Sequence, residues 1–301
     1  MNKKLLLAST AVASMAILGS YGGSEARQAG TTDTQEITIK FTAMVGDRAF
    51  SCASSYTGLG NPGTTASASD FRFYISELAL IDEGGKAVPL KLNQDGKWQH
   101  QNIALLDFEN KSGACTNGTT EISDRIVGSI PKGKYKGLQF TLGVPFNLNH
   151  EDATLAPSPL NLTSLWWNWR GGYKFLRIDL TPQISPSTNH KSGAGHGETQ
   201  GFPIHLGSTG CPSEADNHKP SSCSNPNTVK VTFANFDPNK NVVVADLAAL
   251  LANTNLTINQ PNTPVGCMSA PNDEDCKGIM QSLGLPFDGR PARRQSFFKV
   301  K

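Results

Sequence analysis

Apolar and polar residues alternate with a period of two along several short runs of the chain. The first run places Ile37, Ile39, Phe41, Ala43 and Val45 on one face and Thr38, Lys40, Thr42 and Met44 on the other. Because successive side chains of a strand point to opposite faces, this pattern predicts a strand with one buried face. Similar runs occur at Phe71, Phe73 and Ile75, at Leu138, Phe140 and Leu142, at Tyr173, Phe175 and Arg177, and at Val229, Val231 and Phe233.

Turn-forming segments rich in Gly, Pro, Asn and Asp separate these runs, at residues 83–86, 94–97 and 131–134. Many short strands joined by such turns predict an all-β fold, an antiparallel β-sandwich with long loops. Long surface loops are expected at residues 54–69 and 185–200, which are rich in small and polar residues. Only one or two short helices are expected, one after Asp246 and one from Asp273 to Leu283, because each aspartate can cap a helix.

The N-terminal residues have the pattern of a secretory signal peptide. Lys3 and Lys4 precede an apolar stretch, and small residues follow up to Ala26, which predicts cleavage of residues 1–26. The remaining residues, 27–301, are expected to form a single β-sandwich domain. No cysteine for lipid attachment lies near the predicted cleavage position, so we expect a periplasmic or secreted protein without a membrane anchor.

The cysteines of the chain all lie after the predicted signal peptide. They are Cys52, Cys115, Cys211, Cys223, Cys267 and Cys276. An even number in an exported chain predicts a set of about three disulfides. The short separations favour Cys211 with Cys223 and Cys267 with Cys276, which leaves Cys52 for Cys115. Thiolate ligation of a metal is the less favoured alternative, because no C-x-x-C spacing occurs.

The charge and the motifs exclude several classes of function. The formal net charge is +2 and no basic stripe occurs, so a nucleic-acid partner is not expected. The common hydrolase and nucleotide-binding signatures are absent from the sequence, as is the C-x-x-C-H signature of haem attachment. We therefore expect a protein that is not an enzyme.

Candidate metal ligands are two histidines and a tryptophan. Trp98 and His100 follow an Asp-Gly turn and would share one face of a strand. Intact indole has an N–H donor but no lone pair for a metal, so Trp98 either packs or must first be altered chemically. His205 alternates with the apolar side chains of residues 202–206 and is expected to face away from them. His196, in a polar loop, is the candidate auxiliary ligand.

A tryptophan-rich segment lies at residues 165–179 and contains Trp166, Trp167 and Trp169. Three tryptophans within four residues carry too much aromatic area for an ordinary surface. They could form a packed lid over one end of the sandwich. Alternatively, they could serve as a docking surface or electron path for an oxidising partner enzyme.

The Trp98-Gln99-His100 triplet, the tryptophan-rich segment and the His-Leu-Gly-Ser-Thr-Gly-Cys run at 205–211 together resemble one family across nearly the whole mature chain. This is the family of MbnP-like copper-binding proteins, also called metallo-mystery pair four-Cys proteins, which is related to secreted copper proteins of methanotrophs. The resemblance implies that Trp98 is oxidised to kynurenine, whose amine joins His100 and His205 around copper, most suitably Cu(I). It also implies a partner diheme enzyme of the cytochrome c peroxidase and MauG class, which would oxidise Trp98.

The predicted function is therefore that of an exported, non-enzymatic copper-binding protein in copper acquisition or homeostasis. The alternative is a secreted adhesion or carbohydrate-binding module that uses Trp166, Trp167 and Trp169 as a stacking platform. A copper oxidoreductase is less favoured, because a closed site of three nitrogen ligands gives no indication of a substrate pocket.

Overall fold

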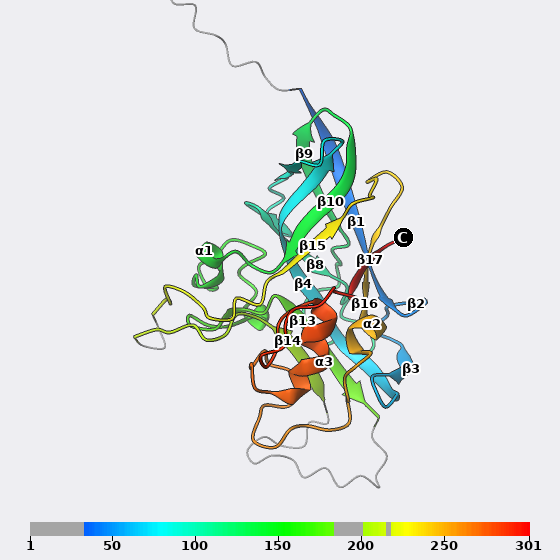
Figure 1. Cartoon of the computed structure of the whole chain (residues 1–301), viewed down its shortest axis with the longest axis vertical. Helices are drawn as coiled ribbons and strands as arrows, with labels where there is room; N and C mark the ends of the chain where they lie inside the picture. The colour runs from blue at the N-terminus through cyan, green and yellow to red at the C-terminus, as the bar shows by residue number, and fades with distance from the viewer. Residues whose placement is uncertain (1–32, 184–200, 215–217) are drawn as a thin grey trace, which may run out of the picture. The chain divides into compact units, whose positions relative to one another are not determined.

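Two β-sheets dominate the computed structural model, which describes residues 33–183, 201–214 and 218–301 (Figure 1). These residues belong to one compact unit, Asp33–Lys301. The predicted signal peptide and His196 lie outside the described residues. No described helix is long and apolar enough to cross a membrane.

The smaller sheet has six strands in the order β17-β16-β1-β9-β6, with β2 paired to β1. Its strands are β1 (Thr34–Val45), β2 (Arg48–Ala49), β6 (Lys91–Leu92), β9 (Arg125–Pro131), β16 (Val243–Asp246) and β17 (Phe298–Val300). Strands β1 and β16 run parallel, which departs from the predicted antiparallel arrangement. The other pairs of this sheet are antiparallel.

The larger sheet has nine strands, arranged around the long central strand β4. Its strands are β3 (Ser55–Leu59), β4 (Thr64–Asp82), β5 (Ala87–Pro89), β7 (Gln99–His100), β8 (Ile103–Asp107), β10 (Tyr135–Leu142), β13 (Leu176–Pro182), β14 (Phe202–Leu206) and β15 (Val229–Phe233). A two-stranded ribbon of β11 (Trp166–Asn168) and β12 (Gly172–Tyr173) lies outside both sheets.

Aromatic side chains join the inner faces of the two sheets. Phe41 of β1 contacts Phe73 of β4 and Phe140 of β10, with ring centroids 6.3 and 5.8 Å apart. Phe298 of β17 contacts Phe140 at 5.2 Å in an edge-to-face arrangement. Such pairs add to the large apolar area that aromatic residues bury. The predicted all-β sandwich is therefore confirmed, and so is the buried face of β1.

Two local predictions are wrong. Residues 54–69 do not form a loop, because Ser55–Leu59 and the first part of β4 pair as neighbouring strands. Their Ala, Ser and Thr side chains suit close packing but give no clear apolar period. In the run at Tyr173, Phe175 and Arg177, the first two side chains are fully buried as predicted, but Arg177 is not, because the buried positions of β13 are Leu176, Ile178 and Leu180. Arg177 instead lies on the polar face of this strand.

Helices are few and short in the described residues, as predicted. They are α1 (Phe146–Asn149), a 3-10 turn (Thr163–Leu165), α2 (Leu247–Leu251) and α3 (Glu274–Leu283). Asp246 accepts from the backbone N–H groups of Ala248 and Ala249, and Asp273 accepts from that of Asp275. These are the two predicted N-caps, which satisfy N–H groups that lack partners within the helix.

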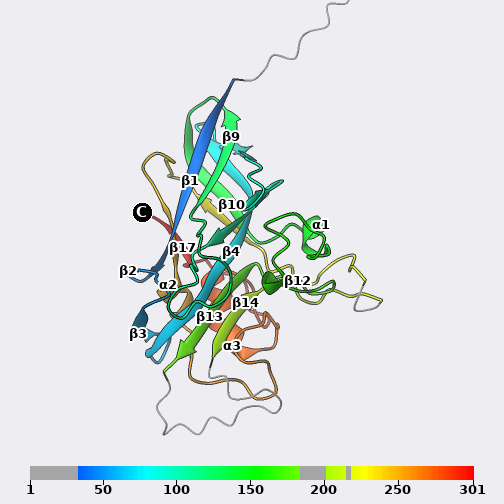
Figure 2. The same cartoon turned by 180° about the vertical axis from the view of Figure 1, so that it is seen from behind.

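The predicted disulfides are all present: Cys52–Cys115, Cys211–Cys223 and Cys267–Cys276. Ile204 of β14 forms a parallel bridge with Cys267, so the third disulfide fastens the segment before α3 beside the larger sheet. Figure 2 shows α1 and β12 on the same side of the molecule. A hydrogen bond of 2.8 Å from the Tyr173 N–H to Asn149 Oδ1 connects these two elements.

Candidate functional site

Trp98 and His100 lie where a tight turn leads into β7. Asp95 Oδ1 accepts hydrogen bonds from the backbone N–H groups of Lys97, Trp98 and Gln99, at 2.7 to 2.9 Å. The Gln99 side chain reaches Val127 of β9, donating to its carbonyl at 2.8 Å and accepting from its N–H at 2.7 Å. These bonds fix the backbone on both sides of the tryptophan.

Both side chains of this pair are half-buried. The Lys97 ammonium lies 4.9 Å from the centre of the Trp98 ring, in a cation-π contact. His100 Nε2 lies 3.2 Å from Gln101 Nε2. His100 is partly open to solvent and has no carboxylate contact within the described part of the chain, so its imidazole is chemically available as a metal ligand.

His205 has a different environment. It lies in β14 opposite Arg177 of β13 and is only 8% exposed. Its Nε2 is 2.7 Å from Asp179 Oδ1. Burial lowers the pKa of His205, although the hydrogen bond with Asp179 opposes this change. The side chain lies on the other face of β14 from Phe202 and Ile204, as predicted, but it is itself buried.

The strand order separates His205 from the Trp98 and His100 pair. Moving across the larger sheet from β7 to β14 passes β8, β4 and β13. Four interstrand spacings amount to about 19 Å along the sheet. The histidines are also at different levels of β4, because His100 aligns through Ile103 with Ser76, whereas His205 aligns through Arg177 with Arg72. The structure therefore does not bring the three predicted ligands together.

A buried ion-pair network explains the position of His205. Arg72 and Asp70 of β4 are 1% and 0% exposed, and Arg72 Nε lies 2.8 Å from Asp70 Oδ1. Arg177 Nε lies 3.1 Å from Asp70 Oδ2, and its Nη2 lies 2.6 Å from Asp179 Oδ2. Side chains of alternating charge thus lie next to one another on β4 and β13, and the row ends at His205 of β14. In the sequence, Asp70 and Arg72, like Arg177 and Asp179, are two positions apart, which is the available signal for this polar row.

The network should make stability depend on pH through Asp179. Burial alone would raise the pKa of Asp179, but the His205 hydrogen bond and the Arg177 charge overcome burial and lower the pKa to about 2. Because the folded pKa lies below the unfolded value of 3.8, this stabilisation is present above pH 3.8 and is lost as the pH falls toward 2. We expect Asp179→Asn to reduce the free energy of unfolding by about 2 kcal/mol at pH 7 and by progressively less toward pH 2.

Urea unfolding of the wild type and the variant at pH 7, 5 and 3 measures this difference. Asp124→Asn is the matched control, because Asp124 forms an exposed pair with Arg125. Exposed pairs contribute about 0 to 1 kcal/mol. A loss of stability in Asp179→Asn that is the same at every pH would contradict the assignment.

The tryptophan-rich segment packs against the body of the protein. Trp166 and Trp167 lie in β11, and Trp166 contacts the hydrophobic core. The rings of Trp166 and Trp169 meet edge to face, with centroids 6.1 Å apart. Trp167 lies against Gly207, where a side chain would collide with its ring. All three tryptophans are half-buried, and the edge-on rings of Trp166 and Trp169 do not share one flat exposed surface.

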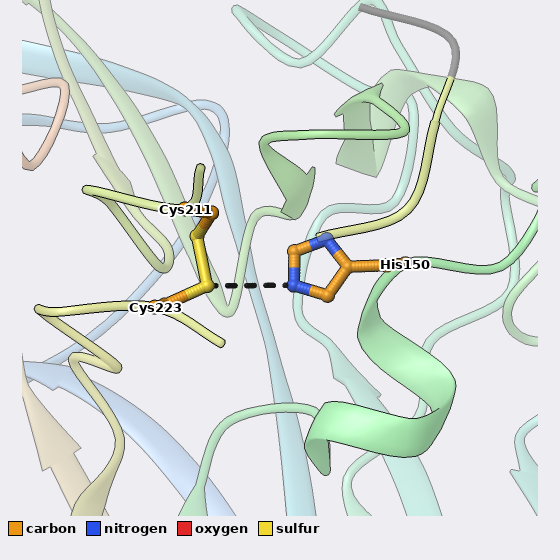
Figure 3. A group of neighbouring side chains, drawn as sticks. All are labelled: His150, Cys211 and Cys223. Atoms are coloured by element: carbon orange, nitrogen blue, oxygen red, sulfur yellow. Dashed lines mark hydrogen bonds between the residues drawn. A yellow bond between two sulfur atoms is a disulfide. The ribbon is translucent and has the colours of Figure 1, made fainter. Parts of the chain in front are cut away.

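His150 lies beside the Cys211–Cys223 disulfide, as Figure 3 shows. Its Nδ1 donates to the Trp169 carbonyl at 2.9 Å, and its Nε2 lies 3.6 Å from Cys223 Sγ. The ligand atoms of His150, Cys211 and Cys223 all lie within 4.8 Å of one another. Among the described residues, this is the group of three or more His, Cys, Asp or Glu side chains close enough to share a metal ion.

The sequence did not indicate a role for His150. It occupies the C-cap of α1. Its approach to Cys223, 73 residues later, is purely tertiary and has no local sequence signal. His218, by contrast, is exposed.

Comparison with known proteins gives a consistent result. A protein-family model described as MbnP matches residues 34–269. Among solved structures, MbnP from Methylosinus trichosporium is similar, with a TM-score of 0.78 and 29% sequence identity. The match covers 89% of this chain and 98% of that one. A comparison with curated proteins gives no match.

Proposed function

Because the chain belongs to the MbnP family, a family associated with methanobactin and copper, we propose that it is an exported copper-binding protein of copper acquisition or homeostasis. The observation that carries this proposal is the family match over residues 34–269. Three disulfides are consistent with an oxidising compartment outside the cytoplasm. The protein would bind copper without catalysing a reaction of its own.

Trp98 and His100 are the proposed centre of the copper site. Their backbone is held by the Asp95 turn, and His100 is partly open to solvent. Oxidation of the indole ring would expose an aromatic amine, which supplies the lone pair that intact tryptophan lacks. Imidazole and amine nitrogen are suitable donors for copper, and the weakly basic aromatic amine favours Cu(I). We therefore expect copper affinity to increase when Trp98 is oxidised.

The third ligand is the part of the proposal that the geometry supports least. In this arrangement His205 is held by Asp179 and is separated from His100 by three strands. His205 could bind copper at the same centre only after a rearrangement that releases it from Asp179. The fit of the residues is therefore good for Trp98 and His100 and poor for His205.

A diheme enzyme of the peroxidase class is the proposed partner. Oxidation of an indole requires removal of electrons, which can pass between aromatic side chains without a substrate pocket. The half-buried Trp166, Trp167 and Trp169 form a compact aromatic segment on one side of the molecule. We propose this segment as the docking surface or electron path for the partner.

Copper titration of protein matured by its diheme partner tests the proposal. Mutation of residues that only support the ligands of a metal lowers metal affinity about 10-fold to 100-fold. Loss of the ligand itself in His100→Ala should therefore lower the copper affinity by at least as much. His218→Ala is the matched control, because His218 is exposed and distant in sequence from the proposed site. Equal affinities for wild type and His100→Ala would exclude the site. A loss in His205→Ala as large as that in His100→Ala would show that His205 leaves Asp179 to join the copper.

A further inference from the structure

Among the described residues, a histidine faces the Cys211–Cys223 disulfide. His150 Nε2 lies 3.6 Å from Cys223 Sγ, and all three ligand atoms fit within 4.8 Å (Figure 3). While the sulfur atoms are bonded to each other, they carry no thiolate charge and are poor metal ligands. The same atoms as thiolates, together with an imidazole nitrogen, would be a soft donor set of the kind that selects Cu(I).

The imidazole of His150 is already oriented as a ligand. Its Nδ1 donates to the Trp169 carbonyl, so the Nε2 atom carries the lone pair that points toward the sulfur atoms. Asn149 Nδ2 lies 3.1 Å from the same Nε2, so this amide would compete with a metal for the lone pair. A neutral imidazole fixed through its other nitrogen is the usual arrangement of a histidine ligand.

A surface cleft leads to this disulfide. Trp167, Ser208, Gly210, Cys211 and Met268 are among the residues that line it. Met268 adds a thioether, which is a further soft donor, to its wall. Cys223 is half-buried, whereas both cysteines of each of the other two disulfides are at most 3% exposed. A reductant therefore reaches Cys211–Cys223 more readily than Cys52–Cys115 or Cys267–Cys276.

We propose that reduction of the Cys211–Cys223 disulfide creates a second copper site, in which two thiolates and His150 Nε2 bind one Cu(I). This site is distinct from Trp98 and His100, and it does not depend on the oxidation of any tryptophan. It goes beyond the proposed function, since it would let the redox state of one disulfide control the copper that the protein holds.

The chemistry balances with a dithiol reductant. The reductant attacks the disulfide and becomes a disulfide itself, and the two electrons and two protons it gives up convert Cys211 and Cys223 to thiols. Binding of Cu(I) then displaces the two thiol protons and leaves the oxidation state of the metal unchanged. A disulfide oxidant, which accepts two electrons and becomes a dithiol, would convert the two thiolates back to the disulfide, remove two of the three ligands and release the copper.

The test uses the full chain without its diheme partner, so that no tryptophan is oxidised. Limited anaerobic treatment with a dithiol, followed by thiol alkylation and peptide mass spectrometry, shows which cysteines are free. Cu(I) is then titrated in competition with a chromogenic chelator. We expect one Cu(I) per chain in the reduced protein that the oxidised protein does not bind, and X-ray absorption showing two sulfur ligands and one nitrogen ligand.

His150→Gln is the decisive variant, because an amide can still donate to the Trp169 carbonyl but supplies no imidazole. We expect its reduced form to bind Cu(I) at least about 10-fold more weakly than the reduced wild type. Asn149→Ala keeps all three ligands and should retain the nitrogen signal. A Cys267→Ser/Cys276→Ser variant should retain the reduction-dependent site. This result would exclude Cys267–Cys276 as the source of the copper-binding thiolates. Equal Cu(I) affinity in the reduced and oxidised wild type, or an unchanged affinity in reduced His150→Gln, would overturn the proposal.

Discussion

Replacing Arg72 by methionine is expected to lower the free energy of unfolding by about 3 to 5 kcal/mol, the usual cost of removing one partner of a buried ion pair. Arg72 is 1% exposed and pairs with Asp70, which is completely buried. Without Arg72, Arg177 is the cationic partner that the described residues leave to the Asp70 carboxylate. Burial also raises the pKa of the neighbouring Asp107 to about 7, while the Arg72 charge lowers it. The variant therefore leaves two buried carboxylates poorly compensated.

Chemical denaturation monitored by tryptophan fluorescence measures this loss. Arg125→Met is the matched control, because Arg125 pairs with Asp124 at 2.8 Å on an exposed surface. Its effect should stay below about 1 kcal/mol. Similar losses in Arg72→Met and Arg125→Met would show that the buried network does not stabilise the sheet.

The second large effect is expected from the Cys52–Cys115 disulfide, which closes a loop of 63 residues. A crosslink stabilises a protein mainly by restricting the unfolded chain, and the restriction grows with loop length. Loop entropy gives about 4 kcal/mol for this disulfide and about 3 kcal/mol for Cys267–Cys276, whose cysteines are separated by nine positions. We expect Cys52→Ser/Cys115→Ser to lose more stability than Cys267→Ser/Cys276→Ser.

Thermal and urea unfolding of the two double variants give the comparison. The variants are matched because all four cysteines are buried and each pair is replaced by two serines. Burial of serine hydroxyls then affects both variants similarly. A greater loss in the Cys267→Ser/Cys276→Ser variant would contradict the dependence on loop length.

Local signals in the sequence predicted much of the fold. The period of two in β1 identified its buried face, because that strand has one face toward the core. Asp246 and Asp273 marked the starts of α2 and α3, since capping depends on a few adjacent residues. Short separations predicted two disulfides, and the third followed by elimination. Each of these features depends on residues that are near in the sequence or few in number.

Features that depend on tertiary contacts were predicted poorly. β4 is buried on both faces over much of its length, so its sequence shows no simple alternation, and its first part was taken for a loop. His205 was expected only to face away from the apolar side chains of its strand, whereas in the structure it is buried and held by Asp179. The distance between His205 and His100 follows from the strand order, which no local pattern encodes. The proximity of His150 to Cys223 depends in the same way on packing between distant loops.

The most direct test of the proposed copper site is peptide mass spectrometry of the protein produced with and without its diheme partner. Conversion of tryptophan to kynurenine adds two oxygen atoms and removes the elements of CO, a gain of roughly 4 Da. We predict this gain on the peptide that contains Trp98, only when the partner is present and together with tighter copper binding. A gain on the peptide with Trp166, Trp167 and Trp169 instead, or no gain on any peptide, would contradict a copper site built on Trp98 and His100.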